Sequence, residues 1–318
     1  MPVRSKSNEI KLTRVYDAPV KAVWDAWTDP EQAAQWWGPR GFTITTHSKD
    51  FRAGGHWRYT MHGPDGVEYL NISNYHEVEQ YKKMVYDHGG NDEQKPLFRV
   101  TVTFKEENGK TTMDMTMTLP SPEAADSTRE YIKKANGNSC WDRLGEYLEK
   151  KVHGNEKFII NRTFDAPIDL VYELWTNPDH FSKWLAPTGF DMKFIRADIK
   201  SGGDTFYCMS NAAGLKMYGR AHYIEVKKPD YLKYTQEFCD ENENLSRHPM
   251  APTWPATMLT IVELTPEGPD QTRVTITWSC HGETTPEELE TFLKGRSGMT
   301  IGWTGSFDKL EDYIKTVA

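Results

Sequence analysis

The chain has 318 residues with 37% hydrophobic residues, which fits two globular domains of about 150 residues each. Its 38 lysines and arginines are dispersed among 46 acidic residues for a net charge of −8, which argues against nucleic-acid binding. Its four cysteines lack a C-x-x-C pair, which argues against a disulfide framework or a zinc site. No apolar run reaches 18 residues and the N-terminus lacks an apolar signal segment. We therefore expect a cytoplasmic protein without a membrane span.

The first half of the chain predicts a strand, two short helices, six further strands and a long helix. Alternating apolar and polar residues predict the first strand over residues 10–16, and helical spacing predicts the two short helices between residues 17 and 36. Residues 41–119 follow a period of two and contain several turn signals, as an antiparallel meander does. A helix over about residues 121–150 closes this half, with Asn136-Gly-Asn138 as a candidate kink.

The second half repeats the first. The stretch Asp17 to Pro39, DAPVKAVWDAWTDPEQAAQWWGP, returns as Asp165 to Pro187, DAPIDLVYELWTNPDHFSKWLAP, at a constant offset (165 − 17 = 187 − 39 = 148). This period is far longer than that of a solenoid and indicates two copies of one domain. We predict domains at residues 1–153 and 154–318. In each copy, the terminal helix is the element long enough to cover the sheet, which predicts an α+β fold.

The copies differ most at residues 239–255, CDENENLSRHPMAPTWP, which form a longer loop than the first copy has. Long loops with apolar residues often carry function. We expect this loop to close over the interior of the second domain or to pack against the first. After it, Thr285-Pro-Glu-Glu288 predicts a capped helix start, and Gly295-Arg-Ser-Gly298 predicts an interruption of that helix.

Both copies carry the run R-x-[FY]-D-A-P-x-x-x-V-[WY]-x-x-W-[TS]-x-P-x-x-x-x-x-W-[WL], a Gly-Gly turn entering a strand, and a terminal helix with Trp before D-[RK]-L-x-x-Y. These features resemble the domain homologous to the C-terminal half of the Hsp90 ATPase activator, in the START/Bet v 1-like (SRPBCC) superfamily. The resemblance covers almost all of the chain. It implies two tandem helix-grip domains, each a curved antiparallel sheet around a long C-terminal helix, with a cavity between them.

The aromatic and methionine residues expected to face these interiors are the main candidates for ligand binding. Aromatic residues make up 12% of the chain, and methionine side chains adapt to ligands of irregular shape. For each residue the alternative is an ordinary place in a filled core. The candidates are Trp36, Trp57, Tyr59, Met61, Phe98, Met115 and Trp141 in the first copy, and Trp184, Tyr207, Met209, Trp254, Trp278 and Trp303 in the second.

Arg220 and His222 are ligand-binding candidates of a polar kind. Arg220 stands where the first copy has Ile72, since 220 − 72 = 148. If this face of the strand points inward, a buried arginine needs a partner or an anionic ligand group. If the face points outward, Arg220 is an ordinary surface charge, and the sequence leaves both possibilities open.

The sequence contains no G-x-S-x-G, H-E-x-x-H or Walker A motif, so we assign no catalytic residue, metal or cofactor. We predict a cytoplasmic protein that holds a small hydrophobic or amphipathic molecule in one or both cavities. Two alternatives remain open. One is an Hsp90-type co-chaperone that binds another protein, although the activator's N-x-N-N-W-H-W motif is absent. The other is a cyclase-like or dehydratase-like enzyme, for which the acid–base candidates His222, Arg220 and Asp114 are scattered.

Overall fold

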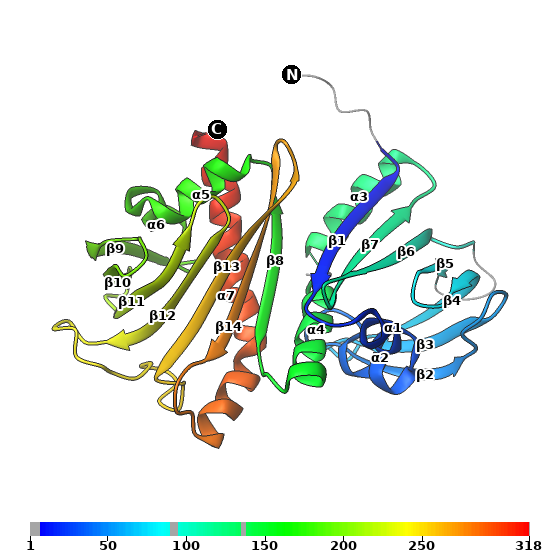
Figure 1. Cartoon of the computed structure of the whole chain (residues 1–318), viewed down its shortest axis with the longest axis horizontal. Helices are drawn as coiled ribbons and strands as arrows, with labels where there is room; N and C mark the ends of the chain where they lie inside the picture. Colours follow the sequence, from blue (N-terminus) through cyan, green and yellow to red (C-terminus); the bar gives the residue numbers. More distant parts are fainter. Residues whose placement is uncertain (1–6, 90–94, 135–137, 318) are drawn as a thin grey trace. The chain divides into compact units, whose positions relative to one another are not determined.

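The computed structural model describes residues 7–89, 95–134 and 138–317. The chain divides into two compact units, Met1–Asn155 and Glu156–Ala318. Each unit has a seven-stranded antiparallel sheet, two short helices after its first strand, and a C-terminal helical segment (Figure 1). The predicted α+β fold of two tandem helix-grip domains is therefore confirmed.

The first unit has the strand order β1-β7-β6-β5-β4-β3-β2, so its first strand lies beside its last. The helical segment that follows β7 is described as two helices, and the predicted kink falls partly on residues 135–137, outside the described residues. A π-helical turn, Glu149–His153, extends the second of these helices. The elements are β1 (Glu9–Tyr16), α1 (Val20–Thr28), α2 (Pro30–Trp36), β2 (Thr43–Lys49), β3 (His56–His62), β4 (Glu68–Glu79), β5 (Lys83–Gly89), β6 (Phe98–Glu107), β7 (Lys110–Thr118), α3 (Pro122–Lys134) and α4 (Ser139–Leu148).

The second unit repeats this topology with the strand order β8-β14-β13-β12-β11-β10-β9. One long helix covers the inner face of its sheet (Figure 1). The elements are β8 (Phe158–Phe164), α5 (Ile168–Thr176), α6 (Pro178–Trp184), β9 (Phe190–Ala197), β10 (Asp204–Asn211), β11 (Lys216–Lys227), β12 (Tyr231–Cys239), β13 (Thr257–Gly268), β14 (Gln271–Cys280) and α7 (Pro286–Val317).

Helix α7 begins as predicted but is not interrupted. The Thr285 hydroxyl accepts a hydrogen bond from the Glu288 backbone N–H, and the Glu288 carboxylate accepts one from the Thr285 N–H, which is a capping box. The predicted break at residues 295–298 is wrong, because the helix continues to Val317. Each glycine disfavours helix by about 1 kcal/mol, but packing outweighs this preference. The helix buries six apolar side chains along its length: Phe292, Met299, Trp303, Phe307, Leu310 and Ile314.

The repeated Asp-Ala-Pro stretch forms the two short helices of each unit. The indole N–H of Trp36 donates to the Ala26 carbonyl over 3.0 Å, and that of Trp184 donates to Leu174 over the same distance. Both acceptors lie ten residues before their tryptophan, and both indole rings are fully buried. The same bond therefore ties the second helix to the first in both copies.

In each unit a cationic side chain of the C-terminal helix donates hydrogen bonds to the loop that precedes β2 or β9. The cation is an arginine in the first unit and a lysine in the second. Arg143 of α4 and Lys309 of α7 each donate to three carbonyls at corresponding positions of this loop. The two cations occupy the same position of the motif D-[RK]-L-x-x-Y, which is Asp142–Tyr147 in the first copy and Asp308–Tyr313 in the second. The bonds are Arg143 to Gly38 (2.8 Å), Pro39 (3.0 Å) and Phe42 (3.1 Å), and Lys309 to Ala186 (2.9 Å), Pro187 (3.1 Å) and Phe190 (3.0 Å).

Candidate functional site

The interior of the first unit is packed with aromatic rings. Trp141 stacks on Trp27 with ring centroids 5.5 Å apart and an interplanar angle of 17°. Trp57 stacks on Tyr59 at 4.2 Å, and the Tyr59 hydroxyl accepts a 3.1 Å hydrogen bond from the indole of a neighbouring tryptophan. All of the residues predicted for this interior belong to the core or pack against it: Trp36, Trp57, Tyr59, Met61, Phe98, Met115 and Trp141. Their role in ligand binding stays a prediction.

In the second unit, four of the predicted tryptophans belong to the core or pack against it: Trp184, Trp254, Trp278 and Trp303. Tyr207 and Met209 lie half-buried on β10. Met209 is opposite Met192 of β9 and Met217 of β11, near one edge of the sheet.

Three indole N–H groups in this interior are buried and have no hydrogen-bond partner in the described part of the chain. They belong to Trp175, Trp278 and Trp303. The ring of Trp303 contacts both others, with centroids 6.1 Å from Trp175 and 5.6 Å from Trp278. Buried donors are nearly always satisfied in folded proteins, so a cluster of three marks a place that an acceptor could occupy.

A ladder of inward-facing tyrosines lies across neighbouring strands of each unit. In the second unit it consists of Tyr207, Tyr223 and Tyr234, on β10, β11 and β12. Burial raises the pKa of Tyr207 to about 12, and it also raises the pKa values of Tyr223 and Tyr234 well above the ordinary value. These phenols are therefore neutral hydrogen-bond donors at physiological pH. The first unit has the same ladder at Tyr59, Tyr75 and Tyr86, each at an offset of 148.

The long loop between β12 and β13 covers one end of the second interior. The Trp254 ring packs against Phe292 of α7 at a centroid distance of 6.1 Å, and His248 packs against Phe238 of β12 at 4.8 Å. Two polar contacts join the loop to α7: the Arg247–Glu288 ion pair and a 2.8 Å hydrogen bond between Thr253 and Thr291. The loop is thus seated on the helix and sheet that enclose this core.

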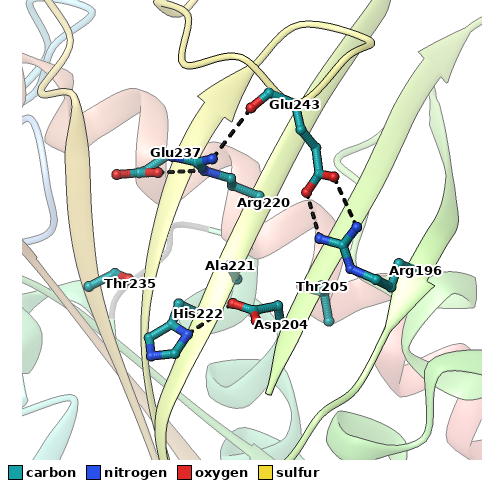
Figure 2. Close-up of a pocket in the computed structure, with 9 residues that line it drawn as sticks. All are labelled: Arg196, Asp204, Thr205, Arg220, Ala221, His222, Thr235, Glu237 and Glu243. Carbon is teal, nitrogen blue, oxygen red and sulfur yellow. Dashed lines mark hydrogen bonds and ion pairs between the residues drawn. The ribbon is translucent and has the colours of Figure 1, made fainter. Parts of the chain in front are cut away.

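Arg220 and His222 lie on the outer face of the second sheet. They alternate along β11 with the buried residues Ala221 and Tyr223, and their side chains are 41% and 56% exposed. The sequence left open whether Arg220 points inward or outward, and the structure shows that it points outward. These side chains line a pocket of about 400 Å³, here called the outer pocket, whose lining residues are drawn in Figure 2. It is formed by Arg196, Asp204, Thr205, Arg220, Ala221, His222, Thr235, Glu237 and Glu243.

Charged side chains in the outer pocket are arranged in pairs (Figure 2). Arg196 donates two hydrogen bonds to the carboxylate of Glu243, over 2.9 and 2.6 Å. Arg220 donates to Glu237 over 2.7 Å, and His222 lies 2.9 Å from Asp204. The bonds from Arg196 hold the pKa of Glu243 below its usual value. Only two of these residues, Arg220 and His222, were predicted as site residues.

Lys49 of β2 is a further unusual group that the sequence did not single out. Its ammonium donates to the Trp27 carbonyl over 2.8 Å and lies 3.9 Å above the ring of Trp57. Burial lowers the pKa of this amine to about 7, an effect that the Asp29 carboxylate partly opposes. A lysine at the end of an alternating strand reads as a surface charge, so only the packed structure shows its environment.

The described residues contain no group of three or more histidine, cysteine, aspartate or glutamate side chains placed to hold a metal ion. Among the described helices, none is both long and apolar enough to cross a membrane.

The topology and the aromatic interiors define a protein of two tandem helix-grip domains. The family described as "Activator of Hsp90 ATPase homolog 1-like protein" matches residues 17–149 and 165–315, once in each unit. The chain belongs to this family. No curated protein matches the sequence.

Several solved structures are similar. A Staphylococcus epidermidis protein is 28% identical over 48% of this chain and 96% of its own, with a TM-score of 0.42. An Arthrobacter aurescens protein is 25% identical over 46% of this chain and 90% of its own, with a TM-score of 0.43. The di-domain ARO/CYC BexL from the BE-7585A biosynthetic pathway is 12% identical, covers 96% of this chain and 98% of its own, and has a TM-score of 0.38.

Proposed function

We propose that the second unit binds a small amphipathic molecule between its sheet and α7, with oxygen acceptors directed at the buried indoles. The supporting observation is the group of N–H donors on Trp175, Trp278 and Trp303, which lack partners among the described residues. Each unsatisfied buried donor is unfavourable by about 1–3 kcal/mol. A ligand with acceptor oxygens and an apolar body would satisfy these donors and keep the surrounding rings out of water.

The first unit lacks the indole donor that Trp278 supplies in the second. Trp278 pairs with Phe158 of the first strand in its sheet, and the corresponding pair in the first unit is Met117 with Ile10 (158 − 10 = 148). Methionine carries no N–H, so the second copy has an indole donor where the first has an apolar side chain. This difference favours the second unit as the one that recognises a ligand with acceptor groups.

The long loop supplies a means of access. It covers the end of the interior through Trp254, and its polar links to α7 are a hydrogen bond from Thr253 and an ion pair between the half-exposed Arg247 and the buried Glu288. A neutral hydrogen bond contributes about 1 kcal/mol and one to a charged group about 1.5–3 kcal/mol, so these two links add only a few kcal/mol to the closed position of the loop. We expect the loop to open at this end, admit the ligand and close again.

Native mass spectrometry of the freshly purified full chain tests this proposal by detecting a co-purifying small molecule. Titration with the amphipathic probe anilinonaphthalene sulfonate then measures affinity. We expect Trp278→Met, which introduces the first unit's residue, and Trp278→Phe to weaken probe binding about tenfold, since one hydrogen bond is worth about 1 kcal/mol or slightly more.

Trp184→Phe is the matched control, because its indole N–H is already bonded to a backbone carbonyl. This substitution should lower the stability of the second unit without weakening its affinity for the probe. Circular dichroism verifies that each variant is folded. Equal probe affinity for the Trp278 and Trp184 variants would contradict the assigned role of the indole donors. A ligand-free protein that changes the ATP turnover of Hsp90 would instead favour the co-chaperone alternative.

A further inference from the structure

We propose that the outer pocket of the second unit is a separate binding site for the carboxylate or phosphate group of a small polar molecule. In this proposal, the incoming oxyanion replaces the side chain of Glu243 on Arg196. The pocket lies on the outer face of the sheet, so the inference does not depend on binding in the interior.

The contact between Arg196 and Glu243 has the geometry of a bound carboxylate. Two guanidinium nitrogens donate to two carboxylate oxygens over 2.9 and 2.6 Å, the bidentate arrangement by which arginine recognises carboxylates and phosphates. Both side chains are partly exposed, at 53% and 30%. An exposed pair of this kind contributes little to stability, so another oxyanion can compete for the arginine.

Glu243 reaches this position from a strained turn of the long loop. Its φ of 63° is in the left-handed region, which is unfavourable for a residue other than glycine. The turn is held by the Asp240 carboxylate, which accepts from the backbone N–H groups of Asn242 and Asn244. Release of the Glu243 side chain from Arg196 therefore breaks one exposed ion pair, while the Asp240 bonds keep the turn in place.

The second arginine is placed to share the anion. Arg220 donates through Nε to Glu237 over 2.7 Å, and its NH1 group makes a longer 3.4 Å bond to the backbone carbonyl of Glu243. Glu237 is further engaged by the Thr257 hydroxyl over 2.7 Å. The bond to the Glu243 carbonyl is at the limit of hydrogen-bond length, so NH1 of Arg220 is available to an oxyanion that has displaced the Glu243 side chain from Arg196. Both guanidinium groups can then donate to one oxyanion.

The remaining charges limit what fits. Asp204 and Glu237 also line the pocket, so an anion with more than two negative charges would be repelled. Each carboxylate already has a partner, since Asp204 lies next to His222 and Glu237 accepts from Arg220. A pocket of about 400 Å³ is large enough for a small metabolite beyond its anionic group. The site thus suits a singly or doubly charged ligand with hydroxyl or amino groups that hydrogen-bond to the acidic residues.

The first unit does not repeat this constellation. At the offset of 148, Arg196, Arg220 and Glu237 correspond to Ser48, Ile72 and Gly89. The strand register agrees, because Ile72 pairs with Gly89 as Arg220 pairs with Glu237. The same fold is therefore built without these charged groups, which indicates that the charges of the outer pocket are not required by the fold.

The test is calorimetric and NMR titration of the full chain with inorganic phosphate and with succinate, at constant ionic strength set by sodium chloride. We expect Glu243→Gln to bind both anions about tenfold more tightly, since the internal competitor is removed, and Arg196→Gln to lose most of the binding. Opposite effects from the two halves of one ion pair would not follow from a merely structural contact.

Arg99→Gln is the matched control. Arg99 is 52% exposed on the outer face of the first sheet and makes a similar bidentate pair with Asp87, over 2.7 and 3.0 Å. Its substitution should leave anion binding unchanged. The proposal is overturned if phosphate has no more effect than chloride, if Glu243→Gln fails to tighten binding, or if Arg99→Gln weakens binding as much as Arg196→Gln. Tighter binding of phosphate than succinate would identify a phosphate ligand, and the reverse a carboxylate.

Discussion

Replacement of Lys49 by methionine should stabilise the first unit, and more so at low pH. In the unfolded chain the amine has its ordinary pKa of 10.5, whereas burial lowers the pKa to about 7 in the folded protein. Between these values the unfolded state binds more protons, so the stability of the native unit rises with pH across this window. The unfavourable contribution of Lys49 is complete below pH 7 and disappears above about pH 10.5.

The size of the effect follows from the pKa difference and the contacts of the amine. A difference of about 3.5 pKa units corresponds to about 5 kcal/mol at pH 6. Loss of the hydrogen bond to Trp27 and of the cation–π contact with Trp57 offsets about 2 kcal/mol of this. Lys49→Met should therefore gain about 3 kcal/mol at pH 6. At pH 9 about 2 kcal/mol of the penalty remains, and because the folded amine is neutral there only the hydrogen bond to Trp27, about 1 kcal/mol, is lost, so the gain falls to about 1 kcal/mol.

Urea denaturation of the full chain measures this difference when unfolding is monitored by deuterium uptake in peptides of the first unit. This readout is not affected by the unfolding of the second unit. Lys82→Met is the control, because Lys82 is exposed and its pKa is raised by the hydrogen bond to Glu79. A gain in stability that is the same at pH 6 and pH 9, or a loss at pH 6, would refute the assignment of a buried, neutralised amine.

Three further predictions concern the helices that cover the sheets. Lys309→Met should lower the free energy of unfolding of the second unit by about 2–3 kcal/mol, because three loop carbonyls lose a charged donor; equal urea midpoints would contradict this. Glu146→Gln should destabilise the first unit by about 3–5 kcal/mol, since it removes one charge of a buried, bidentate ion pair with Arg40. A change below about 1 kcal/mol in the same assay would be inconsistent with this. Gly298→Ala should stabilise the second unit by about 0.5–1 kcal/mol, because the added Cβ meets no heavy atom of the described residues within 4 Å. Gly295→Ala should not stabilise it, because its Cβ would lie 2.9 Å from the ring of Trp254 in the long loop. Equal shifts of the melting temperature for the two variants would argue against that contact.

The sequence predicted the fold well because its signals are local or repeated. The offset of 148 between Asp17 and Asp165 indicated two copies, and the alternating pattern indicated the strands. The prediction failed at residues 295–298, where glycine preference is local but the burial of α7 is a tertiary effect.

The polar sites were harder to predict for the same reason. Arg220 and His222 were recognised as unusual only by comparison of the copies, and their face became clear only from the burial of Ala221 and Tyr223. Arg196 and Glu243 are 47 residues apart, and no local pattern joins them. The environment of Lys49 likewise depends on distant residues, the ring of Trp57 on another strand and the backbone carbonyl of Trp27 on a helix.

The two copies separate the requirements of the fold from those of function. The tyrosine ladder and the Trp36 and Trp184 hydrogen bonds occur at the same positions in both units, so they are explained by the helix-grip architecture alone. The loop before β2 or β9 shows that even a required contact tolerates a different residue, since Lys309 in the second unit takes the place of Arg143 in the first. Features that are present in one unit and unnecessary for this shared framework need another explanation. The buried indole of Trp278 and the arginines of the outer pocket are of this kind, and both occur in the second unit. Ligand binding should therefore depend on the residues that distinguish the second unit from the first. The double substitution Trp278→Met and Arg220→Ile should give the second unit the binding behaviour of the first and leave its fold intact.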